Sequence, residues 1–273
     1  MLVGTVAEIW RYPVKSMAGE RVATSPITAE GIAGDRRWAL RDVETGKIVS
    51  AKRPGRWGRL LEYAATIDDR GLEVTTPHGE RIRLDDPAAA GLLSDALGIA
   101  VEVVSEAPAD DVYASEWPEI EGLVLAGDMD FPVAMDTDSP SFVDLATLHL
   151  LTTAALRTLD GWVGEAVADV RRFRPSLLID AEGDHIVEEG WIGGMLSIGD
   201  VEIAVGDPAP RCVMTTVAQG DLGRRPDVLE QIAAHNKHDV GGFGDFACLG
   251  VYAEVSTPGT VHEGDEVHLT EGG

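Results

Sequence analysis

Short apolar segments interrupted by turn signals fill the first part of the chain, and this spacing restricts the fold more than any other feature. The segments are VGTVAEIW (3–10), RWALRDV (37–43), LEYAATI (61–67), LEVTTP (72–77) and RIRL (81–84). Turn-favouring stretches such as ETGK, DDRG and PHGE separate several of them. Short apolar runs bounded by such turns are typical of strands and hairpins. We therefore predict a β-rich N-terminal part.

A few segments indicate helices instead. Residues 85–99 begin with acidic residues, repeat apolar residues every three to four positions and have Gly98 near their end. Residues 147–161 (TLHLLTTAALRTLDG) give the clearest helical pattern of the second half, and PDVLEQIAAHNK predicts a helix that begins at Pro226. The remaining apolar stretches predict strands: PSLLIDA, MLSIGDVEIAV, CVMTTV, GVYAEV and GDEVHLT.

The composition of a polar stretch rich in Pro and Asp, about 105–141, predicts a long loop or a segment that crosses from one domain to the other. We therefore divide the chain into a β-rich domain over residues 1–110 and a second domain over residues 111–273. The predicted fold class is α+β and strand-dominated, with a β-barrel core covered by helices in the second domain.

Positive charge is concentrated in part of an otherwise acidic chain. The net charge is −25, yet residues 1–83 hold 14 of the 22 Lys and Arg, and residues 84–156 hold none. Cations kept in a few places of an acidic protein indicate an anionic ligand. Because the rest of the surface would repel a polyanion such as DNA, we expect a small anion and no nucleic-acid partner. The acid excess alone is equally explained as an aid to solubility.

Four basic clusters are candidates for that anion site. They are Lys15 with Ser16, Arg36 with Arg37, the AKRPGRWGR stretch at 51–59, and the trio Arg171, Arg172 and Arg174. An Arg at a strand end can donate two parallel hydrogen bonds to a phosphate, and a Lys beside a hydroxyl adds a charge and a donor. Any one of these residues could instead face solvent, so it is their number that favours an anion pocket.

Cys212 is the second kind of candidate. The neighbouring Arg211 favours its thiolate form, and a thiolate suits a metal ligand or a sulfur-transfer group. A lone cysteine is more often a buried structural residue, and the apolar surroundings of Cys248 indicate that role for it. Two cysteines without an export signal predict free thiols and a cytoplasmic protein. No apolar run approaches the ~20 residues of a membrane span, so we expect no membrane partner.

Several stretches together resemble one known family. IWRYPVKSMAGE and GIAGDRRWAL resemble the N-terminal β-barrel domain that precedes MOSC domains. RRFRPSLLID, WIGGMLSIGDVEIAV, PRCVMTTV and PGTVHEGDEVHL resemble the MOSC domain itself, which forms the C-terminal part of molybdenum cofactor sulfurases. The layout is similar to that of the mitochondrial amidoxime-reducing component and its bacterial counterparts.

The resemblance implies a molybdenum cofactor and names its contacts. Cys212 matches the family's protein ligand to molybdenum, and is thereby the implied catalytic and metal-binding residue. The implied contacts to the phosphate and pterin of the cofactor are Lys15, Ser16, Arg36 and Arg174. Two further positions depart from the family pattern: Ser176 replaces an Asn, and Thr147 is the nearest hydroxyl to the place of a Thr–Ser pair.

By resemblance, the chain is expected to be a molybdenum-dependent oxidoreductase that reduces small N-hydroxylated compounds such as amidoximes or hydroxylamines. Because the chain lacks the cysteines of a fused ferredoxin, electrons would come from a separate donor protein. Two alternatives stay open: a sulfur carrier that transfers a persulfide from Cys212, and a protein that carries the molybdenum cofactor without turnover.

Overall fold

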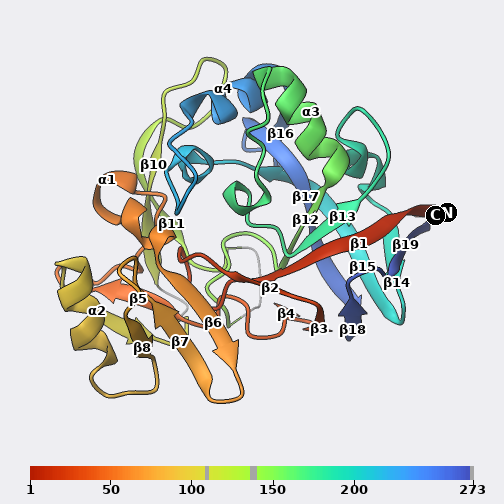
Figure 1. Cartoon of the computed structure of the whole chain (residues 1–273). Coiled ribbons are helices and arrows are strands. Elements are labelled where there is room, and N and C mark those ends of the chain that lie inside the picture. The colour runs from red at the N-terminus through yellow and green to blue at the C-terminus, as the bar shows by residue number, and fades with distance from the viewer. Residues whose placement is uncertain (108–110, 136–139, 271–273) are drawn as a thin grey trace.

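The computed structural model describes residues 1–107, 111–135 and 140–270, and a closed barrel of seven strands lies at its centre (Figure 1). In order around the ring the strands are β12 (Leu148–Thr152), β13 (Leu177–Asp180), β1 (Leu2–Arg11), β19 (Glu266–Thr270), β14 (Met195–Ile198), β15 (Val201–Pro210) and β17 (Asp245–Thr257). Pairing of β17 with β12 closes the ring. β12 and β13 run parallel, and the other neighbours are antiparallel.

Both ends of the sequence build this barrel. β1 lies between β13 and β19, and the amino group of Met1 donates a hydrogen bond to the Leu269 carbonyl at 2.6 Å. β2 (Glu20–Val22) pairs with β1, while β3 (Thr24–Thr28) lies between β4 (Gly31–Ile32) and β18 (Gly259–His262). The first turns of the chain are therefore held against the barrel, which matters for the site below. The expected domain boundary near residue 110 stays a prediction.

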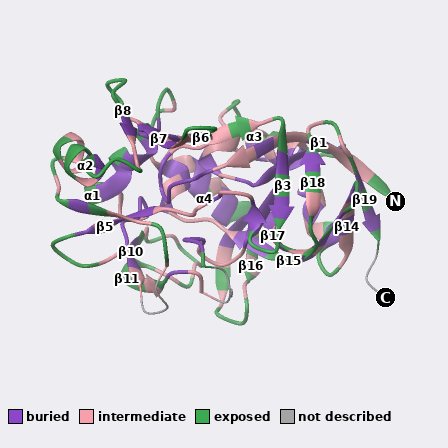
Figure 2. Ribbon diagram, turned by 90° about the horizontal axis from the view of Figure 1, so that it is seen from below, coloured by how far each residue is buried: buried purple, intermediate pink, exposed green. Residues whose placement is uncertain are grey.

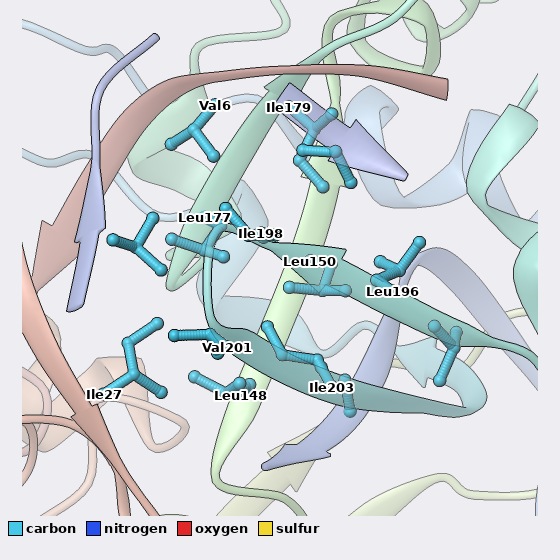
Figure 3. Close-up of a cluster of buried hydrophobic side chains, with 14 of the residues drawn as sticks. Val6, Ile27, Leu148, Leu150, Leu177, Ile179, Leu196, Ile198, Val201 and Ile203 are labelled. Carbon is cyan, nitrogen blue, oxygen red and sulfur yellow. The ribbon is translucent and has the colours of Figure 1, made fainter. Parts of the chain in front are cut away.

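Aliphatic side chains from all seven strands fill the barrel (Figure 3). Val6 of β1, Leu150 of β12, Ile179 of β13, Leu196 of β14 and Ile203 of β15 are all buried there. They point inward because successive side chains of a strand face opposite sides of the sheet. Burial of each such side chain contributes about 1.5–3 kcal/mol, so this core fixes the register of the strands.

A second β-rich unit lies beside the barrel and has its own core (Figures 1 and 2). Its elements are β5 (Ala39–Asp42), β6 (Ala64–Asp68), β7 (Gly71–Thr75), β8 (Arg81–Arg83), β9 (Val101–Val104), α1 (Pro54–Trp57), the 3-10 helix η1 (Gly58–Glu62) and α2 (Ala89–Leu97). Leu60, Tyr63, Val74 and Leu93 are buried in this core. The predicted strands of this part are confirmed, and so is the helix, which ends at Gly98 in a left-handed cap with φ 70°.

Two helices cover one side of the barrel, α3 (Thr153–Val163) and α4 (Pro226–His235) (Figure 1). Leu159 and Ile232 of these helices are buried against Leu151 and Leu249 of the barrel strands. Four short elements complete the fold: η2 (Val170–Arg172), η3 (Val187–Trp191), η4 (Val213–Thr216) and β16 (Lys237–Asp239). The α+β class with a barrel core is thus confirmed. Within the described ranges, no helix is both long and apolar enough to span a bilayer.

The prediction of one helix over residues 147–161 is wrong for its first half. Residues 148–152 form β12, and the helix begins only after Thr152, whose extended backbone and side chain cap it by accepting from the Ala155 N–H at 3.0 Å. Every residue of β12 is buried, because Leu150 faces the barrel interior and Leu151 the covering helices. A strand buried on both faces reads as a continuous apolar run, which periodicity alone does not separate from a helix.

Two further expectations differ from the structure. CVMTTV is a turn of 3-10 helix rather than a strand, since the Thr215 N–H and hydroxyl both donate to the Cys212 carbonyl, at 3.2 and 3.0 Å. Threonine hydroxyls compete in this way with strand pairing. The 105–141 stretch is not wholly a loop, because it contains the hairpin of β10 (Val112–Trp117) and β11 (Gly127–Pro132).

Candidate functional site

The residues singled out from the sequence line one pocket between the barrel and the N-terminal unit. They are Lys15, Ser16, Arg36, Thr147, Arg174, Ser176 and Cys212. They belong to five separate stretches of chain: the turn after β1, the turn after β4, the start of β12, the loop before β13 and the end of β15. The fold therefore brings together side chains that are far apart in sequence.

Backbone hydrogen bonds join the first two of these turns. The Lys15 N–H donates to the Trp38 carbonyl at 2.8 Å, and the Arg36 N–H donates to the Tyr12 carbonyl at 2.8 Å. The Asp35 carboxylate accepts from the Tyr12 N–H at 2.6 Å. Lys15 and Arg36 are thereby fixed relative to each other by their main chains, not only by their side chains.

Three of the pocket residues have a backbone that non-glycine residues rarely adopt. The φ angles of Ser16, Arg36 and Arg174 are 66°, 46° and 55°, in the left-handed region. Such a conformation costs roughly 1–2 kcal/mol per residue, so neighbouring contacts must hold it. For Ser16 one of these is its hydroxyl, which accepts from the Ala51 N–H at 2.9 Å. Strain of this kind concentrates where a side chain must point in a required direction.

Arg36 and Arg174 lie against the same aromatic ring. Their guanidinium carbons are 4.7 and 4.2 Å from the centroid of the Tyr12 ring, within the range of a cation–π contact. Burial and the nearby charge of Arg36 lower the pKa of Arg174 to about 10, so it stays protonated at neutral pH. Burial opposes the charge of Arg36, but its salt bridge with Asp35 outweighs burial and raises its pKa.

Asp144 holds two lysines at the opposite side of the pocket. Lys15 Nζ lies 2.5 Å from one carboxylate oxygen, and Lys52 Nζ lies 2.9 Å from the other. Lys15 also donates to the Phe142 carbonyl at 2.8 Å and Lys52 to the Tyr113 hydroxyl at 3.0 Å. Both ammonium groups are 4.7 Å from the centroid of the Tyr113 ring.

The charges of these three groups depend on one another. Burial lowers the pKa of Lys15, whereas the Asp144 carboxylate outweighs burial and raises the pKa of Lys52 well above its ordinary value. The two ammonium groups likewise outweigh burial at Asp144 and lower the pKa of its carboxyl far below the usual range. The Asp144 carboxylate therefore holds the ammonium groups of both Lys15 and Lys52 at this side of the pocket.

Cys212 follows the end of β15 and is half-buried in the wall of the pocket. Lys52 lines the same pocket. Arg211, the expected neighbour, instead directs its guanidinium to the Phe173 carbonyl at 2.6 Å. Cys248 is fully buried in β17, and burial raises the pKa of its thiol to about 12, as expected of a structural cysteine.

The hydroxyl and imidazole groups of the pocket differ in how they are bonded. Ser176 Oγ accepts from the His149 N–H at 3.2 Å. Thr147 Oγ1 is buried and has no hydrogen-bond partner among the described residues. Burial, reinforced by the charge of Arg211, lowers the pKa of His149 well below its ordinary value, so its ring is neutral at pH 7. An external partner would therefore satisfy Thr147 Oγ1.

The described lining of the pocket is strongly cationic. Six of these residues are basic, and Asp144 is the one acidic residue among them. The basic residues are Lys15, Arg36, Lys52, Arg172, Arg174 and Arg211. Arg172 is structural, because its guanidinium donates to backbone carbonyls such as that of Gly223 at 2.7 Å. In a chain of net charge −25, a pocket with this many cations indicates a binding site for an anion.

Four other members of the basic clusters, Arg37, Arg53, Arg56 and Arg171, form ion pairs away from the pocket. Arg37 pairs with Glu30, Arg171 with Asp169, and Arg53 with Asp128. Sequence reasoning placed Lys52 in a cluster of four cations and had no signal to choose it over its neighbours. Nothing in the sequence indicated Tyr12, Tyr113 or Asp144 as supports of the site, because their roles depend on the turns that the fold brings together.

Comparison with known proteins finds two family models that match this chain. Residues 3–112 match the family model of the MOSC N-terminal beta barrel domain, and residues 138–268 match that of the MOSC domain. The chain is 25% identical to mitochondrial amidoxime-reducing component 1 of Mus musculus and 27% identical to that of Homo sapiens. These alignments cover 98% of this chain and 82% and 83% of the two relatives. It is also 27% identical to a molybdenum cofactor sulfurase of Drosophila erecta, over 96% of this chain and 33% of that protein.

Proposed function

The chain belongs to the MOSC proteins that carry the N-terminal barrel domain, and on that basis we propose that it is a molybdenum-cofactor-dependent oxidoreductase. Its substrates would be small N-hydroxylated compounds: amidoximes, which the names of two relatives mention, and hydroxylamines, which the resemblance implied. The observation that carries the proposal is the meeting of Cys212 with Lys15, Arg36 and Arg174 in one pocket.

The residues of the pocket fit an anionic cofactor that brings a metal to a thiolate. The cation excess suits the phosphate of a pterin cofactor, since Arg and Lys donate charge-assisted hydrogen bonds. The unpartnered Thr147 Oγ1 and the three left-handed backbones fit a preformed cradle for such a ligand. The half-buried Cys212 offers a soft ligand at the wall of that cradle.

Each group would then have a defined role. Arg36 and Arg174, held on Tyr12, and Lys15, held by Asp144, would bind the anionic part of the cofactor. Ser16, Thr147 and Ser176 would supply hydroxyl contacts to it. Cys212 would be the ligand to molybdenum, and Lys52 lines the pocket beside it. When bound, the cofactor supplies two-electron redox chemistry at the metal.

The overall reaction determines which reactants the site must receive. Reduction of an N-hydroxyl group takes two electrons and two protons, breaks the N–O bond and releases water. The electrons would come from a separate donor protein, and the substrate is a small molecule. The cytoplasmic location expected from the sequence remains part of this proposal, as does the absence of nucleic-acid and membrane partners.

Metal analysis together with an amidoxime assay tests the proposal. Protein produced with molybdate is expected to hold near-stoichiometric molybdenum and to reduce benzamidoxime when a reduced viologen supplies electrons. Both properties should be lost in Cys212→Ala and kept in Cys248→Ala, the matched control away from the pocket. A metal-free protein with a trappable persulfide on Cys212 would instead show a sulfur carrier. Bound molybdenum without reduction under several donors would show a cofactor carrier.

A further inference from the structure

A large apolar cavity adjoins the cationic pocket at Cys212, and the proposed cofactor contacts leave it unassigned. Its volume is about 580 Å³, within the range of small-molecule sites. The two hollows are continuous, because they share Lys52, Leu145, Ala146, Pro210, Cys212 and Tyr252. A molecule in the cavity would therefore reach the sulfur of Cys212 from one side.

Aromatic rings from the β10–β11 hairpin and from β17 line the cavity. Ring centroids are 6.0 Å apart for Tyr113 and Phe131, 6.1 Å for Phe131 and Trp117, and 5.9 Å for Trp117 and Phe246. Such a series of faces and edges suits stacking against a flat ring of a ligand. Phe243, which also lines the cavity, is 70% exposed, so a ligand would cover apolar surface that otherwise faces water.

Two carboxylates give the cavity a negative end. Asp207 and Glu254 line it, and neither carboxylate forms an ion pair or a hydrogen bond with another described residue. The pairing of β15 with β17 shifts register between Val205 and Pro208, and Asp207 lies within this irregular segment. Bulges of this kind redirect side chains next to binding sites.

The carboxylate end lies away from Cys212. Four residues of mostly extended chain lie between Asp207 and Cys212. Five steps of about 3.3 Å put their Cα atoms up to roughly 16 Å apart. The cavity therefore has an end at Cys212, where the proposed reduction would take place, an aromatic middle and an anionic end.

We infer that the cavity selects N-hydroxylated compounds in which an aromatic ring separates the N–O group from a distal positive charge. This specificity rests on the reductase function proposed above. The N–O group would lie at Cys212, the ring against Trp117 and Phe131, and the cation between Asp207 and Glu254. A distal carboxylate would be repelled by the same two residues.

Three benzamidoximes with para substituents of similar length test this specificity. The substituents are 3-aminopropyl, butyl and 3-carboxypropyl, so the first two differ mainly in charge. For wild-type holoprotein, kcat/KM is expected to be about fivefold higher for the aminopropyl than for the butyl compound, because an exposed ion pair contributes up to about 1 kcal/mol. The carboxypropyl compound should have the lowest kcat/KM of the three. In Asp207→Asn/Glu254→Gln the ratio of the first two should fall to about one. Glu182→Gln, at an exposed carboxylate outside the cavity, should keep the wild-type ratio.

A binding measurement separates failure of the specificity from failure of the reductase function. The non-reducible 4-(3-aminopropyl)benzamide is expected to quench tryptophan fluorescence and to bind about fivefold more tightly than 4-butylbenzamide. This difference should vanish in the double carboxylate variant, and the quenching should weaken in Trp117→Phe. If no benzamidoxime is reduced but these binding differences hold, the reductase function fails and the cavity's preference stands. Equal binding and equal kcat/KM of the charged and uncharged compounds would overturn the inference.

Discussion

The guanidinium of Arg36 donates a hydrogen bond to the backbone carbonyl of Arg174 at 3.3 Å, across 138 positions of sequence. Both residues have left-handed backbones, and both guanidinium groups lie over the ring of Tyr12. Two like charges this close repel each other, so the pair is held by Tyr12, by Asp35 beside Arg36, and by the Met17 carbonyl, which accepts from Arg174 at 2.6 Å. An anion placed between them would remove the repulsion.

Loss of either arginine should therefore weaken retention of the cofactor. Each removes a charge-assisted hydrogen bond worth about 1.5–3 kcal/mol, or roughly 10- to 100-fold in affinity. We expect Arg36→Ala and Arg174→Ala to be purified with much less molybdenum than the wild type, as measured by elemental mass spectrometry. Arg37→Ala is the matched control, because Arg37 pairs with Glu30 at the surface. Full cofactor content in both pocket variants would contradict the role given to this pair.

Replacement of Asp144 by Asn should destabilise the folded chain by leaving Lys15 and Lys52 without their shared anion. Because Asp144 is partly exposed, we expect a loss of about 1–3 kcal/mol, below that of a fully buried pair. The folded-state pKa of Asp144 lies below its ordinary 3.8, so its contribution is present above about pH 4 and is lost as the pH falls further. Urea unfolding at pH 7 and pH 3.5 should show the difference between wild type and Asp144→Asn shrinking at the lower pH. A difference that does not change with pH would contradict the ion-pair explanation.

Glu188 should make the protein less stable at neutral pH than it is in mild acid. Its fully buried carboxyl accepts from the Thr152 hydroxyl at 2.6 Å, and burial raises its pKa from 4.5 to about 7. Between these two values the folded chain binds more protons at Glu188 than the unfolded chain, so stability falls as the pH rises through this window. The loss is as much as about 3 kcal/mol.

Glu188→Gln keeps the neutral form at every pH and should remove this loss. Relative to wild type, the variant is expected to gain stability from pH 5 to pH 8 in thermal or urea unfolding. Glu182→Gln, at an exposed carboxylate, should follow the wild type across the same range. The assignment of this pH dependence to Glu188 is wrong if its variant also follows the wild type.

Much of the fold could be predicted from local patterns, and the exceptions share a cause. The strands of the N-terminal unit, α2 and α4 are confirmed, because each has an apolar period bounded by clear turn or capping residues. β12 was mistaken for helix because both of its faces are buried, one by the barrel and one by α3 and α4. Burial on a second face depends on tertiary packing, which local periodicity does not contain.

The residues of the candidate site also fall into two groups, those that could be predicted from the sequence and those that could not. Charge indicated the turns at Lys15, Arg36 and Arg174, the neighbouring Arg211 drew attention to Cys212, and resemblance to a family assigned these residues to one cofactor. Lys52 could not be separated from the other cations of its cluster, since what distinguishes it is the distant Asp144 carboxylate, 2.9 Å from its Nζ. Residues that support a site through long-range contacts leave no pattern in the sequence next to them.

Gly31 should be needed for the position of Thr147, the unpartnered hydroxyl of the pocket. Gly31 has φ 93°, and a Cβ at this position would lie 2.5 Å from the Thr147 carbonyl oxygen. Gly31→Ala must therefore displace the start of β12 as well as strain its own backbone. Gly79 is the matched control, because its φ is 84° but a Cβ there would meet no atom within 4 Å.

We expect Gly79→Ala to cost only about 1 kcal/mol from backbone strain, with no change in cofactor content. Gly31→Ala should cost about 3 kcal/mol or more, since the close contact is with backbone that cannot rotate away. It should also lower the molybdenum content of purified protein, because Thr147 would shift relative to Ser176 and Arg174, which line the same pocket. Unfolding measurements and elemental mass spectrometry on the two variants check both effects. Equal stability losses at the two glycines would show that β12 has room to move. The close contact between Gly31 and the Thr147 carbonyl would then not be what positions Thr147.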